Sequence, residues 1–276
     1  MILAAAVAAN MALDLLFVAV LGGGIQGAAV ATALTQVFSA CLCGAYLCRS
    51  HRELLLKKSE LKLDRGSFFR TLSFGLITSM HQCSLYLGKT FVQGAVNTGG
   101  TEIIAAYTAA TRIEGFANSF GSSGMTATSI LTAQNYGAGR TERVEGTFWR
   151  SLGWTAAMGT LSAVLMFVFA PHAIALLLGS SEGTAFTAAV AYLRFVALFY
   201  TFCFTGSTFT GYFSGIGKVM LPFMGTFGHI TLRVILSWLL FGRMGLNAVA
   251  LATGLGWICC NVFWGGCKLW RARRKA

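Results

Sequence analysis

GIQGAAVATALTQ, residues 24–36, has a near copy in GLNAVALATGLGW, residues 245–257. Each copy directly follows an apolar segment, NMALDLLFVAVL at 10–21 and HITLRVILSWLL at 229–240. In both segments the second copy lies about 220 residues after the first. Internal repeats of this kind are common in membrane transporters. The pattern indicates a repeated pair of helices joined by a short turn that contains glycine.

The composition places the chain in a membrane. Hydrophobic residues make up 55% of it and charged residues 11%, whereas soluble domains carry about 25% charged residues. In lipid, apolar segments of spanning length must be helical, because each backbone polar group has to be paired within its own segment. We therefore predict an all-α integral membrane protein of about eight transmembrane helices, at 1–21, 25–48, 67–94, 102–136, 148–171, 185–214, 220–241 and 245–267.

The basic residues are unevenly distributed between the two sets of loops. Of the 21 Lys and Arg residues, sixteen lie in 49–70, 139–150, at Lys218 and in 268–276, and only Arg243 lies in the loops on the opposite side. Cytoplasmic loops are enriched in Lys and Arg, so we predict a multi-pass protein of the cell membrane with both termini in the cytoplasm. The net charge of +12 is then a topology signal, and no nucleic-acid partner is expected.

The repeat predicts how the helices are grouped. Its second copy ends a set of six helices, whereas its first copy comprises two helices alone. We expect residues 1–48 to be the last two helices of an N-terminal lobe, 49–66 to be a basic cytoplasmic linker, and 67–276 to be a complete six-helix C-terminal lobe with a basic tail. Within the linker, RELLLKKSELKLDRG (52–66) is typical either of an interfacial amphipathic helix or of a solvated connection.

Four motifs, in order along the chain, resemble one transporter family. They are N-x-x-x-D-L-L-F at 10–17, G-x-x-G-A-A-x-A-T at 24–32, AAYTAATRIEGFA at 105–117 and QNYGAGRTERVEG at 134–146. Together they are similar to the multidrug and toxic compound extrusion (MATE) transporters. The resemblance implies twelve helices in two lobes, of which this chain matches helices five to twelve, and export of organic cations in exchange for Na⁺ or H⁺. It also implies that the first four helices are missing, unless a separate chain supplies them as a partner.

The first predicted helix carries the candidate coupling site. Asn10 and Asp14 are four residues apart and therefore share one face of a helix. A hard cation prefers carboxylate, amide and hydroxyl oxygens, and a desolvated carboxylate is suited to carrying a proton. The resemblance implies an ion or proton site at these two residues, completed by Thr32 and by an acid on a helix that this chain lacks. The alternative is structural: Asn10 bonds a neighbouring helix and Asp14 pairs with a base.

The second lobe carries the candidate substrate cavity. Family members that bind the cation there use acids on helices seven and ten, but the matching segments here have none, which favours coupling through the first lobe. Glu114, within the fourth predicted helix, is expected to attract cationic substrates. Met80, Gln82 and Tyr86 are further cavity candidates, although packing in the core is the alternative for each. His229 and Arg233 occupy the repeat positions of Asn10 and Asp14, so this second copy should not bind a cation.

The sequence also bears on functions other than export. No H-E-x-x-H or G-x-S-x-G motif and no pair of membrane aspartates is present, so we predict that the chain is not an enzyme. The eight cysteines lack ligand spacing, and neither a metal nor a cofactor is expected apart from the coupling Na⁺ or H⁺. A lipid-linked oligosaccharide flippase and an inactive transporter fragment stay open as alternative functions.

Glycines 115, 121 and 124 predict that the long helix over 102–136 either is broken or packs through small residues.

Overall fold

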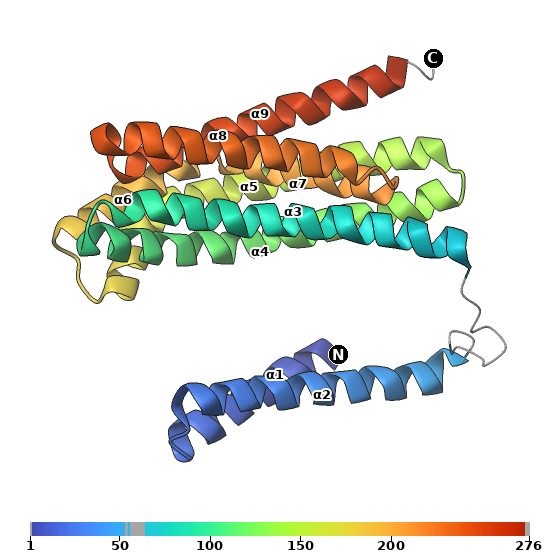
Figure 1. Ribbon diagram of the computed structural model, residues 1–276, viewed down its shortest axis with the longest axis horizontal. Coiled ribbons are helices and arrows are strands. Elements are labelled where there is room, and N and C mark those ends of the chain that lie inside the picture. Colours follow the sequence, from blue (N-terminus) through green and yellow to red (C-terminus); the bar gives the residue numbers. More distant parts are fainter. Residues whose placement is uncertain (1, 53–54, 56–63, 274–276) are drawn as a thin grey trace. The chain divides into compact units, whose positions relative to one another are not determined.

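The chain forms two compact helical units (Figure 1). The structure is a computed structural model that describes residues 2–52, 55 and 64–273. The first unit is Met1–Phe68 and the second is Phe69–Ala276. All regular secondary structure in the described residues is helical, which confirms the predicted fold class. Most of the predicted amphipathic linker segment lies outside the described residues.

The first unit is a helical hairpin. Its helices are α1 (Ile2–Asp14), the π-helix η1 (Leu15–Val20) and α2 (Gly24–Ser50). The hairpin closes tightly, because a Cβ on Gly27 would lie 2.7 Å from the carbonyl oxygen of Phe17. Glycine at this position therefore allows the backbones of the two helices to approach each other.

The second unit is a bundle of long helices that lie side by side (Figure 1). Its helices are α3 (Arg65–Asn97), α4 (Thr101–Gly137), α5 (Thr141–Leu178), α6 (Thr184–Ala197), α7 (Tyr200–Gly215), α8 (Met220–Met244) and α9 (Leu246–Arg273). Six of the eight predicted segments correspond to one helix each, while 1–21 corresponds to α1 with η1 and 185–214 to the pair α6 and α7. That pair is bent by 52° at Leu198 and Phe199.

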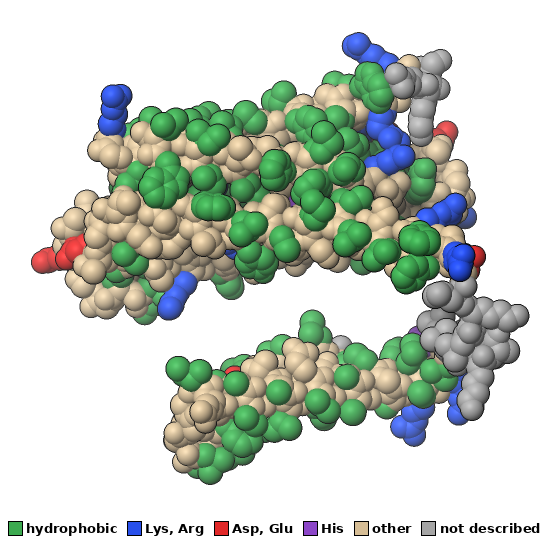
Figure 2. Space-filling model, in the orientation of Figure 1, with side chains coloured by type: hydrophobic (Ala, Val, Ile, Leu, Met, Phe, Trp, Pro, Cys, Tyr) green, Lys and Arg blue, Asp and Glu red, His purple; other side chains and the backbone are tan. Residues whose placement is uncertain are grey.

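The helices are long and apolar enough to cross a bilayer. Within the described residues, five spans meet this test, with α1 and η1 counted together, or six if α6 and α7 form one span. The helices α3 and α4 have sufficient length, at 33 and 37 residues, but are more polar. Many large apolar side chains are exposed along the helices, and in Figure 2 the Lys and Arg side chains of the second unit gather mainly at the end where α9 ends. An apolar belt with a basic end is expected of a bundle in lipid.

Of the two predictions for α4, a break and packing through small residues, the break is not observed. The helix runs without interruption through its three interior glycines, and two of them serve close packing. A Cβ on Gly124 would lie 3.1 Å from Cγ2 of Thr155 in α5, and one on Gly121 would lie 3.7 Å from the ring of Phe204 in α7. The alternative prediction, packing through small residues, therefore describes this helix.

Candidate functional site

The carboxylate of Asp14 lies at a change of helix type. The α-helix α1 ends at Asp14, and the wider π-helix η1 begins at the next residue. The Asp14 side chain does not cap η1, and its buried Oδ1 accepts no hydrogen bond from any described residue. Because π-helical turns are often found at functional sites and an unpaired buried oxygen is costly, this carboxylate is available to a ligand.

The amide of Asn10 contacts α2 close to the predicted partner. Its Nδ2 donates a 3.4 Å hydrogen bond to Oγ1 of Thr35, which is 7% exposed. Thr32 is exposed, and its hydroxyl donates to the Ala28 carbonyl oxygen at 2.9 Å. The structure thus brings Asn10 to Thr35 and does not bring it to Thr32. The two helices are antiparallel, with Asn10 beside Thr35 and Phe17 beside Gly27. Asp14 therefore lies opposite the turn of α2 that precedes Thr35.

A polar cavity of about 590 Å³ lies within the second unit. It lies between α3, α4, α7, α8 and α9, and its volume is within the range of roughly 300–1,000 Å³ that is typical of small-molecule sites. On α3 the lining residues recur every four positions, at Leu85, Lys89 and Gln93, so one face of this helix borders the cavity. The charged lining residues are Lys89, Glu114 and Arg233, and the aromatic ones are Tyr107 and Trp257.

The charged groups of this cavity are incompletely paired. Glu114 is 7% exposed, and its Oε1 is buried without a hydrogen-bond partner in the described part of the chain. Arg233 donates from Nη2 to the Tyr107 hydroxyl at 3.2 Å, while its Nε is buried and unpaired among the described residues. The two side chains form no ion pair in the described region, in which Lys268 with Glu145 is the pair observed. Opposite charges therefore border one space without neutralising each other directly.

The remaining predicted cavity residues lie beside this face of α3. Gln82 is exposed, as are Met80 and Tyr86, which are 55% and 66% exposed, and none of the three lines the 590 Å³ cavity. Tyr86 is nonetheless adjacent, because the ammonium group of Lys89 lies 5.5 Å from the centre of its ring. Of the four candidates in the second lobe, Glu114 lines the cavity; the roles of the other three stay predictions.

Sequence reasoning noticed His229 and Arg233 but assigned them no part in a site. Both line the cavity together with Glu114. The imidazole of His229 packs so closely on α9 that a Cβ on Gly256 would lie 2.2 Å from its Cδ2, and its buried Nε2 has no partner among the described residues. The signal was their charge and polarity within a transmembrane segment, where such groups are expensive and mark functional sites.

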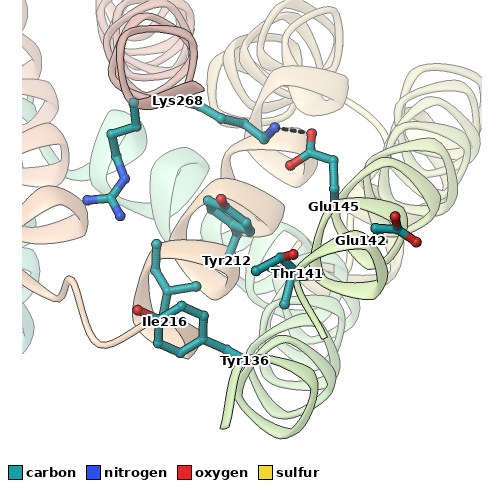
Figure 3. A pocket seen from close by; sticks show the side chains of 9 residues that line it. Tyr136, Thr141, Glu142, Glu145, Tyr212, Ile216 and Lys268 are labelled. Atoms are coloured by element: carbon teal, nitrogen blue, oxygen red, sulfur yellow. Dashed lines mark hydrogen bonds and ion pairs between the residues drawn. The ribbon is translucent and has the colours of Figure 1, made fainter. Parts of the chain in front are cut away.

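A second pocket, of about 310 Å³, lies where α4 ends, α5 begins and α7 and α9 end (Figure 3). Lys268 of α9 reaches across it to form an ion pair with Glu145 of α5. The same ammonium group lies 4.4 Å, 5.2 Å and 5.6 Å from the ring centres of Phe148, Trp149 and Tyr212. Since a cation over aromatic rings is attracted to their faces, Lys268 fastens the end of α9 to α5 and α7.

The replacement Lys268→Met is expected to loosen this end of the bundle. Methionine keeps the apolar packing over the rings but removes the charge, which should cost about 1–2 kcal/mol because Glu145 is 48% exposed and its attraction is screened. Thermal unfolding in detergent should show a melting temperature lower by a few degrees, with Lys218→Met, at an exposed lysine, as the control. An equal loss in a Glu145→Gln background would contradict a role for the ion pair.

The family of this chain is shown by comparison with known proteins. The model of the MatE family matches residues 78–239. A curated relative, the probable multidrug resistance protein YpnP of Bacillus subtilis, is 24% identical over 258 residues, which are 93% of this chain and 57% of that protein. The chain thus spans a little over half the length of this relative.

Solved structures share the fold of the chain. A crystal structure of a MATE protein in complex with MaL6 matches with a TM-score of 0.88 and 23% identity, over 98% of this chain and 62% of that one. A transporter of the MOP superfamily from Pyrococcus furiosus, described as having a binding pocket of reverse polarity, matches with a TM-score of 0.86 and 23% identity, over 98% and 60% of the two chains.

Proposed function

Because this chain belongs to the MatE family, we propose that it acts as a cation-coupled antiporter that exports organic compounds by alternating access. The proposed driving ion is Na⁺ or H⁺, and the proposed substrates are organic cations and related drugs. The proposed location is the cell membrane, with the basic ends of the helices and both termini in the cytoplasm. The uneven distribution of Lys and Arg supports this orientation.

The observation that carries the proposal is the 590 Å³ cavity lined by charged side chains of apolar helices. Placing a charged group in a bilayer costs about 2.5–3.5 kcal/mol on insertion scales. The insertion free energy of Glu114, Arg233 and Lys89 together would be unfavourable without any benefit if the bundle had no ligand to bind. Their convergence on one cavity supports a substrate-binding role in a protein of this transporter family.

Coupling is proposed to act through Asp14. Its Oδ1 is buried and unpaired within the described residues, and Asn10 lies one turn before it on the same helix. Binding of Na⁺ or a proton would neutralise this carboxylate and remove the cost of its burial. Since η1 begins at the next residue, neutralisation is proposed to change the stability of the π-helical segment and so the position of this hairpin.

The flippase alternative is less favoured. The curated relative is named as a multidrug resistance protein. A pyrophosphate would meet the buried carboxylate of Glu114 in the cavity, although Arg233 and Lys89 line it too. The name of the relative, rather than the charge of the cavity, therefore makes the flippase the less favoured proposal.

Reconstitution of the chain into liposomes tests the proposed function. A fluorescent organic cation is placed inside, and an inward Na⁺ or H⁺ gradient is then imposed separately. We expect one gradient to accelerate release of the dye over protein-free liposomes, and the other to have little effect. Release that responds to neither gradient, from protein shown to be folded and inserted, would reject the proposal.

A further inference from the structure

We propose that the 590 Å³ cavity of the second unit selects zwitterionic substrates, amphipathic compounds that carry one ammonium and one carboxylate group. This inference rests on the proposed export function and revises its substrate class, since it places zwitterions ahead of the organic cations proposed above. It follows from two oppositely charged side chains, the buried Glu114 and the half-buried Arg233, that border one cavity without forming an ion pair in the described part of the chain.

Each of the two charged groups can bind a ligand group of opposite charge. The Tyr192 hydroxyl lies beside the Glu114 carboxylate, but Oε1 of Glu114 lacks a donor at hydrogen-bond distance, and Nε of Arg233 lacks an acceptor, among the described residues. Leaving a buried charged group unsatisfied costs more than the hydrogen bond itself contributes. A ligand that donates from an ammonium to Glu114 and accepts with a carboxylate at Arg233 satisfies both groups at once.

Ligands of a single charge fit less well. An organic cation would satisfy Glu114 but would meet the positive charges of Arg233 and Lys89 across the same cavity. An organic anion would satisfy Arg233 but would leave Glu114 unpaired and repelled. Lys89 is exposed and lies over the ring of Tyr86, so the ranking rests mainly on Glu114 and Arg233.

The surroundings hold the backbone at Glu114 and the side chain of Arg233, and they supply an apolar wall. The backbone oxygen of Glu114 accepts a hydrogen bond from the buried Tyr200 hydroxyl at 3.3 Å, and the guanidinium group of Arg233 is held by Tyr107 at 3.2 Å. The indole of Trp257 borders the same cavity and offers a flat face to an aromatic substrate. The preferred ligand therefore combines an aromatic body with an amine and a carboxylate.

Three probes with one aromatic body test the inference. L-tryptophan is a zwitterion, its methyl ester is a cation, and N-acetyl-L-tryptophan is an anion. We expect the purified full chain in detergent to bind tryptophan roughly 10-fold or more tightly than either derivative, by isothermal titration calorimetry, because each derivative strands one buried charge. Equal affinity for tryptophan and its ester, or no binding of any probe at millimolar concentration, would overturn the inference.

Two variants assign the charges. In Glu114→Gln the preference for tryptophan over the N-acetyl derivative should disappear, and in Arg233→Gln the preference over the methyl ester should disappear. The same change for all three probes in both variants would contradict the assignment. If either variant fails to fold, the comparison of the three probes on the unmodified chain still decides the outcome. Gradient-driven dye release without charge preference would reject this inference alone, whereas charge preference without gradient response would reject the proposed coupling.

Discussion

Replacing Asp14 by asparagine should abolish gradient-driven export while leaving the protein folded. Asparagine keeps the size of the side chain but can neither carry a proton nor balance the charge of Na⁺. We expect at least a 10-fold loss of the gradient-dependent rate in liposomes, because a hydrogen bond to a charged group contributes about 1.5–3 kcal/mol. The rate of dye release under an imposed gradient is the measurement.

The control for this variant is another acidic residue. Glu182 lies exposed in the loop before α6, so Glu182→Gln should leave the rate unchanged. The melting temperature of Asp14→Asn should stay equal to or above that of the unmodified chain, since a buried charge has been removed. Full gradient-driven export by Asp14→Asn would place the coupling group elsewhere.

The threonine of this proposed coupling site differs between the sequence-based prediction and the structure. The family resemblance assigned Thr32, whereas the structure brings Asn10 to Thr35. If the contact seen here belongs to the coupling site, Thr35→Val should reduce the gradient-dependent rate more than Thr32→Val. The opposite order would support the assignment made from the motif.

The helices could be predicted because their determinants are local. Runs of apolar residues and the basic loops between them defined each segment, for example 220–241 against the observed α8, Met220–Met244. Helix ends were less predictable. The segment expected at 148–171 became α5, Thr141–Leu178, because the helix begins in the polar residues 141–147 and continues past Pro171 and His172.

The bend between α6 and α7 was not predictable, because no local sequence signal accompanies it. No proline or glycine marks Leu198 and Phe199. The ring of Phe199 fits against α9, where a Cβ on Gly254 would lie 2.3 Å from it. The glycine that accommodates this ring is 55 positions further along the chain, so no local pattern signals the bend.

The cavity was only partly predictable for a similar reason. Glu114 was identified because it is the acid of the RIEGFA motif in an apolar helix. Arg233 was known to be charged, but the meeting of α4 and α8 at one cavity depends on how the bundle packs. From the sequence, Arg233 was predicted to occupy a repeat position that cannot bind a cation. Its position in the lining of the same cavity as Glu114 was not predicted.

Replacing Gly211 by leucine should have the largest effect on stability. A Cβ at Gly211 in α7 would lie 2.5 Å from the Met125 carbonyl oxygen and 3.0 Å from Cβ of Thr128, both in α4. One turn on, a Cβ at Gly215 would lie 2.7 Å from the Ser129 carbonyl oxygen. This G-x-x-x-G pair therefore lets α7 lie directly on the backbone of α4.

Such contact matters more in lipid than in water, because helix association in a bilayer depends on close packing and on hydrogen bonds. The Met125 carbonyl oxygen cannot move away without distorting α4, so even Gly211→Ala should cost about 1–3 kcal/mol. In Gly211→Leu the helices must separate, and we expect little or no monodisperse protein after detergent extraction, measured by size-exclusion chromatography.

The control, Gly153→Leu, adds the same side chain at an exposed glycine with open space around its Cβ position and should elute as the unmodified chain does. Equal recovery of both variants would mean that α4 and α7 do not pack through these glycines in the folded protein.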